Sequence, residues 1–96
     1  MKKIKYVVFL TDEFMNTDVD ALELSQRAYN VLKRQRINTI RDLISTINSE
    51  NDLLKFRNCG SGTAHEIMKK LFDYHYSLLD DKQKNIYKQR LMKLNW

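Results

Sequence analysis

The sequence predicts an all-α domain, a small bundle of helices, and three observations support this fold class. The protein has 96 residues, enough for one hydrophobic core, which argues against a two-domain enzyme. Hydrophobic residues make up 43% of it and charged residues 30%, so it carries enough apolar surface to fold. Zero prolines and two glycines argue against an all-β sandwich or barrel, because those folds need frequent turn residues.

The first eighteen residues are predicted to form an N-terminal arm. Residues 1–11, MKKIKYVVFLT, are rich in β-branched and aromatic types without helical spacing, which indicates a short strand or an extended segment. A single strand cannot form a sheet, so this segment would pack on the helices, pair with a partner or a second copy, or stay mobile. Residues 12–18 are predicted to be a polar connector.

Helical spacing of apolar residues begins at Val19, and capping signals divide the remaining sequence into helices. Ser25 is predicted to cap a first helix that ends near Gln35-Arg36. Two short helices come next, each with a hydroxyl and a carboxylate three residues apart to satisfy the free amides of the first turn. The pairs are Thr39 with Asp42, for a helix over 39–47, and Ser49 with Asp52, for a helix over 49–55.

Both glycines lie in the segment Asn58-Cys59-Gly60-Ser61-Gly62, a predicted tight turn that starts a long helix to about Tyr74. Glycines at a helix start let free amides face outward as an anion site. The spacing is neither that of a P-loop nor that of a dinucleotide fingerprint, so nucleotide hydrolysis is not supported. A tight turn without any ligand is the alternative interpretation.

The last seventeen residues predict a separate basic amphipathic helix over 80–96, with Ile86, Tyr87, Leu91 and Leu94 on one side. Its five basic residues form either a solvated face or a second phosphate-binding surface. They are Lys82, Lys84, Lys88, Arg90 and Lys93. Trp96 is either a docking anchor or part of a self-association patch.

Charge and cysteine content narrow the partners and the compartment. The 17 basic and 12 acidic residues give a net charge of +5, which favours an anionic partner. One cysteine allows no internal disulfide, and the longest apolar run is too short for a membrane span, so we expect a cytoplasmic protein. Cys59, His65 and His75 do not have the spacing of a zinc site, so we predict no metal or cofactor and no enzyme activity.

Two further side-chain predictions concern the core. Cys59 is expected to be a small buried hydrophobe rather than a nucleophile. The aromatic residues at helical spacing are expected at the core or its edge, not on a stacking platform for single strands. They are Tyr29, Phe56, Phe72, Tyr74 and Tyr76.

Four linked blocks resemble the C-terminal domain of the bacterial RNA polymerase alpha subunit. The blocks are LELSQRAYNVLK at 22–33, INTIRDL at 37–43, RNCG at 57–60, and Glu66-Ile67. The resemblance covers about residues 19–79. It implies a compact four-helix domain with a helix-hairpin-helix-like unit, which binds the minor groove of AT-rich promoter DNA and contacts transcription factors.

The resemblance also implies a DNA-binding site. Arg27 and Asn30 match the arginine and asparagine of the family's first helix, and a guanidinium is attracted to the negative potential of a narrow A-tract groove. The family's glycine, phosphate-contacting serine and glutamate fall on Gly60, Thr63 and Glu66. Amides and hydroxyls at the helix start would hold the flanking phosphates. The expected DNA-binding set is Arg27, Asn30, Gly60, Ser61, Gly62, Thr63 and Glu66, and Glu23 is a possible protein contact.

Three departures from the family pattern change the expectation. The family commonly has a lysine where this protein has Gly62, so DNA affinity and its salt dependence should be reduced. Of an acidic pair that contacts the sigma factor, only Glu23 is matched, because Ala21 occupies the other position. The sequence has no large assembly domain, so we expect a protein that imitates or competes with the tail of an alpha subunit.

The sequence therefore leaves three function classes. The first is a DNA-binding, transcription-associated protein of the bacterial cytoplasm or nucleoid. The second is a protein-interaction module that docks on RNA polymerase or a transcription regulator without binding DNA. The third is a structure-selective DNA binder outside transcription, because helix-hairpin-helix units also serve DNA-repair proteins.

Overall fold

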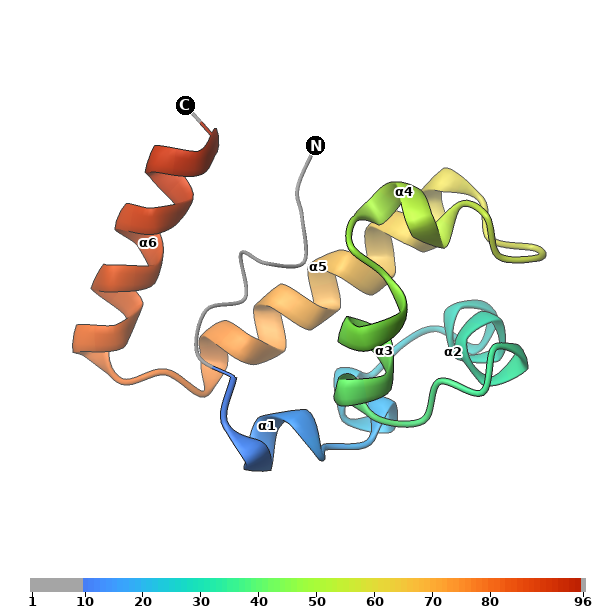
Figure 1. Cartoon of the computed structure of the whole chain (residues 1–96), viewed down its shortest axis with the longest axis horizontal. Helices are drawn as coiled ribbons and strands as arrows, with labels where there is room; N and C mark the ends of the chain where they lie inside the picture. Colours follow the sequence, from blue (N-terminus) through green and yellow to red (C-terminus); the bar gives the residue numbers. More distant parts are fainter. Residues whose placement is uncertain (1–9, 96) are drawn as a thin grey trace.

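The computed structural model describes the backbone of residues 10–95 and the side chains of residues 10–89. Every regular element in this range is helical, which confirms the all-α class (Figure 1). The elements are α1 (Asp12–Met15), the 3-10 helix η2 (Val19–Leu22), α2 (Gln26–Arg34), α3 (Ile40–Thr46), α4 (Glu50–Leu53), α5 (Ser61–Ser77) and α6 (Asp81–Asn95). The strand or extended segment predicted for residues 1–11 lies, apart from Leu10 and Thr11, outside the described residues.

Side-chain caps set the starts of the helices, as predicted. The Ser25 hydroxyl accepts the Ala28 amide at 3.2 Å and begins α2. At α3, Thr39 and Asp42 each accept the other's amide at 3.1 Å, a complete capping box. Amides of Asn38 and Thr39 hydrogen-bond to the carboxylate and hold the pKa of Asp42 below its usual value.

At the start of α4, the Asp52 carboxylate accepts backbone amides in the same way as Asp42 does at α3. Asp52 accepts the amides of Asn48 at 2.7 Å and of Ser49 at 3.3 Å. The Asn48 bond is the main reason that the pKa of Asp52 is also lowered. Both short predicted helices are therefore present, with bounds slightly inside the expected ones.

The predicted polar connector over 12–18 is wrong for its first half, which is helix α1. The Thr11 hydroxyl accepts the Phe14 amide at 3.1 Å, and two acidic residues occupy the first turn, where the helix dipole favours them. Phe14 is 2% exposed and belongs to the core. A helix of one turn has too few residues to show apolar periodicity, so only its cap and one buried ring mark it.

The rest of the connector is hydrogen-bonded to the start of α3. The Val19 amide donates to the Asn38 carbonyl, and the Ile40 amide donates to the Thr17 carbonyl, both at 2.9 Å. Asp18 and Thr39 thereby form an isolated antiparallel bridge. These bonds and the buried Phe14 hold residues 12–18 against the helices that follow.

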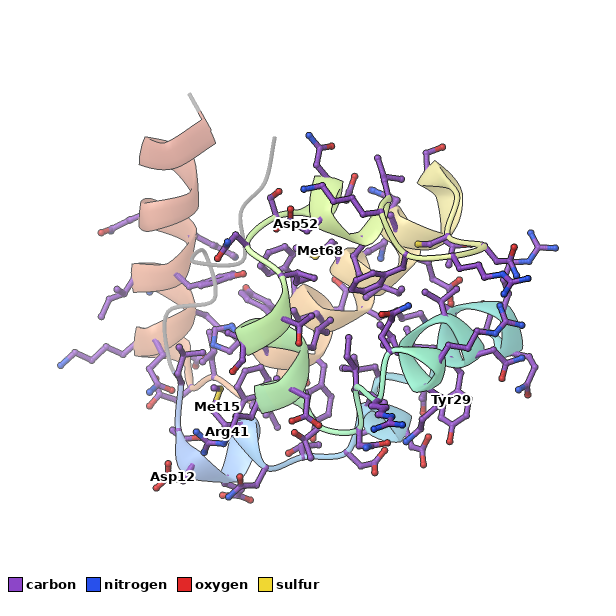
Figure 2. The ribbon with its side chains drawn as sticks, turned by 45° about the vertical axis from the view of Figure 1, so that its right-hand side comes forward. Asp12, Met15, Tyr29, Arg41, Asp52 and Met68 are labelled. Atoms are coloured by element: carbon purple, nitrogen blue, oxygen red, sulfur yellow. The ribbon has the colours of Figure 1, made fainter. Side chains whose placement is uncertain are left out.

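Helix α5 runs through the middle of the molecule and contacts α2, α4 and η2 (Figure 1). Ile67, Met68 and Leu71 on its inner side are at most 1% exposed, and Figure 2 labels Met68. The helix continues to Ser77, three residues beyond the predicted end, because Tyr74 packs against the core and His75 is buried. Cys59 is buried as expected, and burial raises the pKa of its thiol.

Aromatic side chains attach the final helix α6 to α5. Tyr87 is 3% exposed, with its ring centroid 5.2 Å from that of His75 and 6.0 Å from that of Tyr76. The ammonium groups of Lys84 and Lys88 lie 5.2 and 5.7 Å from the Tyr76 ring centroid. The predicted helix over 80–96 is thus present, and Tyr87 is on its buried side.

Several side chains of that prediction fall outside the described range. The side chains of Arg90, Leu91, Lys93, Leu94 and Trp96 lie there. The five aromatic residues expected at the core or its edge are all partly buried.

Candidate nucleic-acid interface

An open groove of about 1020 Å³ lies between α2 and the start of α5, which sit at the same end of the molecule (Figure 1). All seven residues of the predicted DNA-binding set line it. The seven are Arg27, Asn30, Gly60, Ser61, Gly62, Thr63 and Glu66. The other residues that line the groove are Ser25, Val31, Arg34 and Asn58. Glu23 is not part of the lining; it is exposed in a left-handed conformation, with φ 53°, after η2.

Helix α2 presents a polar, positively charged face to the groove. Arg27, Asn30 and Arg34 are three and four residues apart, so they project on one side, while Ala28 and Leu32 are buried on the other. Both arginines are exposed, and within residues 10–89 neither makes a hydrogen bond or an ion pair. Their guanidinium groups are therefore available to a ligand.

Asn30 contributes a hydrogen-bond donor to the same face. Its Oδ1 accepts the Gln26 side-chain amide at 3.0 Å, one turn back along α2. This bond orients the side chain and leaves the Asn30 NH₂ group to donate elsewhere. The polar face of α2 therefore offers donors from three side chains.

The start of α5 faces the groove without a capping side chain. Gly60 occupies the N-cap position, with φ −81°, and no acidic residue lies in the first turn. Ser61 and Gly62 are exposed, so their amides, which have no partner inside a helix, are open to the groove. A helix of 17 residues carries partial positive charge at this end, which suits a phosphate or carboxylate.

Neither glycine is required by the backbone conformation or by internal packing. Neither has a positive φ, and a Cβ added at either one would meet no atom within 4 Å. The positive φ of the turn belongs instead to Asn58, at 62°, a residue type that tolerates this conformation. The glycines therefore leave bare backbone in front of the groove, which permits close approach of a ligand.

Thr63 and Glu66 contribute differently from the exposed residues. Thr63 is only 9% exposed, so it forms part of the groove floor. The Glu66 carboxylate accepts the Ser25 amide at 2.7 Å and the Ser25 hydroxyl at 2.8 Å. Because that hydroxyl also caps α2, Glu66 ties the start of α2 to the second turn of α5.

Three exposed residues of the groove were not assigned to the site from the sequence: Arg34, Asn58 and Ser25, of which Ser25 was predicted only as a helix cap. Arg34 follows Arg27 by seven residues, two helical turns, and this spacing places both on one face. That signal was present in the sequence. Asn58 lies in the turn that the sequence predicted over 58–62, but it was not assigned to the binding site.

Comparison with known proteins identifies the family. Residues 10–73 match the family described as the C terminal domain of the bacterial RNA polymerase alpha chain. The protein belongs to this family. The match covers α1 to most of α5, so the alpha C-terminal domain includes the groove, whereas α6 lies beyond the matched residues.

Relatives of this alpha C-terminal domain are DNA-directed RNA polymerase alpha subunits. That of Moorella thermoacetica is 40% identical over 67 residues, 70% of this protein and 21% of the relative. That of Oceanobacillus iheyensis is 40% identical over 70 residues, covering 73% and 22% of the two proteins. That of Cutibacterium acnes is 43% identical over 68 residues, covering 71% and 20%. The matched part spans about a fifth of the length of these relatives. No solved structure matches it.

No three His, Cys, Asp or Glu side chains of the described residues come together as a possible metal site. Within the same range, no helix has both the length and the apolar content to cross a membrane.

Proposed function

We propose that this alpha C-terminal domain binds double-stranded DNA through the groove between α2 and α5, and that it acts in bacterial transcription. One observation carries the proposal: two guanidinium groups without a partner among residues 10–89 and an uncapped helix start face the same open groove. A polyanion with hydrogen-bond acceptors complements this surface.

The face of α2 suits the minor groove of AT-rich DNA. An A·T pair shows only acceptors there, adenine N3 and thymine O2, and Arg27 and Asn30 both offer donors. A narrow A-tract groove also has an enhanced negative potential that draws in an arginine. We therefore assign Arg27 to the minor groove, with Asn30 beside it.

The start of α5 suits the phosphates that border that groove. The open amides of Ser61 and Gly62 can each donate to a phosphate oxygen, and the bare backbone at Gly60 allows the strand to come close. Such contacts orient the protein on the duplex without reading bases. Base recognition and phosphate anchoring thus belong to two different elements of one surface.

The partners and compartment in this proposal follow from the family. We propose that the domain works beside RNA polymerase or a transcription factor, in the bacterial cytoplasm or nucleoid, and that it does not catalyse a reaction. Glu23, exposed at the end of η2, remains the candidate protein contact.

The test is a fluorescence-anisotropy titration with an AT-rich duplex at low salt. Arg27→Ala should weaken binding by about 1–3 kcal/mol and reduce the preference for AT-rich over GC-rich duplex. Arg41→Ala is the matched control, because Arg41 is an exposed arginine paired at 3.6 Å with Asp12, at the α1 end of the molecule (Figure 2). Absence of wild-type binding, or equal losses in both variants, would overturn the proposal.

The same proteins separate the remaining function classes. A pull-down from bacterial lysate that recovers RNA polymerase after nuclease treatment, together with no duplex binding, would favour the protein-interaction module. Tighter binding to forked or gapped DNA than to AT-rich duplex would favour a structure-selective role outside transcription.

A further inference from the structure

The groove is lined by a second arginine, Arg34, to which the proposed DNA-binding mode gives no role. Arg34 lies in the last turn of α2, lines the groove and is exposed. It follows Arg27 by seven residues, which places it about 10 Å further along the helix axis on the same face. The two guanidinium groups therefore occupy different positions along the groove rather than one shared site.

The formal charge of the groove lining depends on Arg34. The charged residues that line the groove are Arg27, Arg34 and Glu66. Without Arg34 the lining would be neutral, because Glu66 would balance Arg27. Glu66 is engaged by the amide and hydroxyl of Ser25, but it keeps its negative charge. The net positive charge of the groove lining thus depends on Arg34.

No partner in the described part of the protein uses the Arg34 side chain. The neighbouring Lys33 donates to Asn38 at 2.9 Å and lies over the Tyr29 ring, so it has a structural role. Arg34 has no such role, because it makes no hydrogen bond, ion pair or ring contact among residues 10–89. Its guanidinium can therefore reach into the groove without breaking an interaction of the fold.

The α5 side of the groove has no cationic side chain among its described lining residues. Gly62 supplies no side chain, and the space in front of it is open for at least 4 Å. The amides of the α5 start are neutral donors with partial positive charge only. A full positive charge elsewhere in the same groove would strengthen the binding of a DNA backbone.

Resting on the proposed DNA binding, we propose that Arg34 is a second DNA-contacting residue, which binds a backbone phosphate and supplies the cation that Gly62 does not. Arg27 then contacts the minor groove, and Arg34 anchors the strand that borders it. The expectation of reduced salt dependence, drawn from Gly62 alone, is revised accordingly. The domain should bind DNA with one more phosphate contact than its glycine-rich turn suggests.

The test measures the dependence of DNA affinity on salt for Arg34→Gln and for Arg36→Gln. Loss of one phosphate contact should lower the slope of log K against log salt by about 0.9, so affinity should fall about eightfold at 0.1 M salt and converge with wild type near 1 M. The loss should be equal for AT-rich and GC-rich duplexes, because a phosphate carries no sequence information. Arg36 is the control: it is exposed, two residues away and outside the groove lining, and the substitution removes the same charge.

A second variant tests the compensation directly. Adding Gly62→Lys to Arg34→Gln should restore most of the lost slope, because it returns a positive charge to the groove lining at a position where a side chain has open space. An unchanged slope in Arg34→Gln, or an equal decrease in Arg36→Gln, would overturn the role of Arg34 while wild-type binding and its loss in Arg27→Ala leave the proposed function intact. Absence of wild-type binding would overturn both.

Discussion

At the scale of single residues, the groove depends on Gly60, which leaves the start of α5 without a capping side chain. Every helix start from α1 to α4 has a side-chain oxygen that accepts a backbone amide, from Thr11, Asp18, Ser25, Thr39 or Asp52. The start of α5 has Gly60 and no side-chain cap. A helix without an N-cap side chain is less stable than a capped one. The start of α5 is therefore less stable than a capped start, but its amides remain available as donors.

The substitution Gly60→Asp should therefore separate stability from binding. A carboxylate at the N-cap accepts the free amides and interacts favourably with the helix dipole, which should raise the free energy of unfolding by about 0.5–1 kcal/mol. The Cβ meets nothing within 4 Å and φ is −81°, so no strain offsets this gain. DNA binding should weaken strongly, because the same amides are occupied and a negative charge faces the phosphates. Urea unfolding and anisotropy titration measure the two effects.

Two variants control this prediction. Gly60→Ser also caps the amides but adds no charge, so its loss of affinity should be smaller. Asn85→Asp makes the same change in net charge at an exposed position of α6 and should leave affinity near that of wild type. If Gly60→Asp stabilises the protein and binds DNA as well as wild type, the amides at the α5 start do not contact phosphate.

The residues of the site were partly predictable from the sequence. Arg27 and Asn30 share a helix face by their spacing, and the glycines pointed to the start of α5. The burial of Thr63 was not predictable, because it depends on how α5 packs against distant elements. Nor was the bond between Glu66 and Ser25, which joins residues 41 positions apart.

At the scale of elements, the Glu66 carboxylate fixes how α2 sits against α5. Its two oxygens accept one hydrogen bond each, from the amide and from the hydroxyl of Ser25. This clamp sets the position of Arg27, two residues after Ser25, relative to the open amides of α5. In the proposed DNA complex, Glu66 would therefore act by positioning α2 rather than by contact, since a carboxylate repels phosphate.

The substitution Glu66→Gln should weaken the clamp. A glutamine offers one oxygen where two are used, so the free energy of unfolding should fall by about 1 kcal/mol. The preference for AT-rich over GC-rich duplex should fall, because α2 is held less firmly against α5. Affinity for mixed-sequence duplex should fall less or even rise, because a negative charge leaves the groove. Anisotropy titrations with matched duplexes give the ratio.

The matched control for this element is Glu50→Gln. Glu50 lies on α4, 3.7 Å from His65, and does not line the groove. The Glu50→Gln substitution removes the same charge as Glu66→Gln and should preserve the preference for AT-rich duplex. A Glu66→Gln variant with unchanged stability and unchanged AT preference would contradict the positioning role.

Helix boundaries were predictable wherever a capping pair marks them. The N-caps of α2, α3 and α4 are Ser25, Thr39 and Ser49; a single hydroxyl marked Ser25, and the hydroxyl and carboxylate spacing marked the other two. Helix α1 was missed because one turn shows no periodicity. The end of α5 was placed too early because His75 is polar in sequence yet buried between the rings of Phe14 and Tyr87.

At the scale of the whole molecule, the family match and the attachment of α6 define two parts. The matched region ends at residue 73, whereas α6 begins at Asp81 and packs back through Tyr87. The Tyr87 hydroxyl is buried and has no hydrogen-bond partner among the described residues. Burial, with a smaller effect of the nearby Asp73 charge, raises the pKa of Tyr87 to about 12.

We expect Tyr87→Phe to be neutral or stabilising, by up to about 1–3 kcal/mol, because it removes a buried polar group that forms no bond. The ring contacts with His75 and Tyr76 remain. The pH dependence should change as well. The raised pKa means that the unfolded protein releases this proton first, so wild-type stability should fall as the pH rises from 10 toward 12, and this part of the fall should be absent in Tyr87→Phe. Urea unfolding at pH 7 and above pH 10 measures both effects.

Tyr87→Ala distinguishes the role of the ring from that of the hydroxyl. It removes the contacts with His75 and Tyr76 and should cost about 3–5 kcal/mol, with faster amide hydrogen exchange in α6. Its DNA affinity, measured where the protein remains folded, should stay near that of wild type, because the described residues that line the groove come from Ser25, α2 and residues 58–66. A marked loss of stability in Tyr87→Phe would show that the hydroxyl has a partner. A loss of DNA affinity in folded Tyr87→Ala would mean that α6 takes part in the DNA-binding surface.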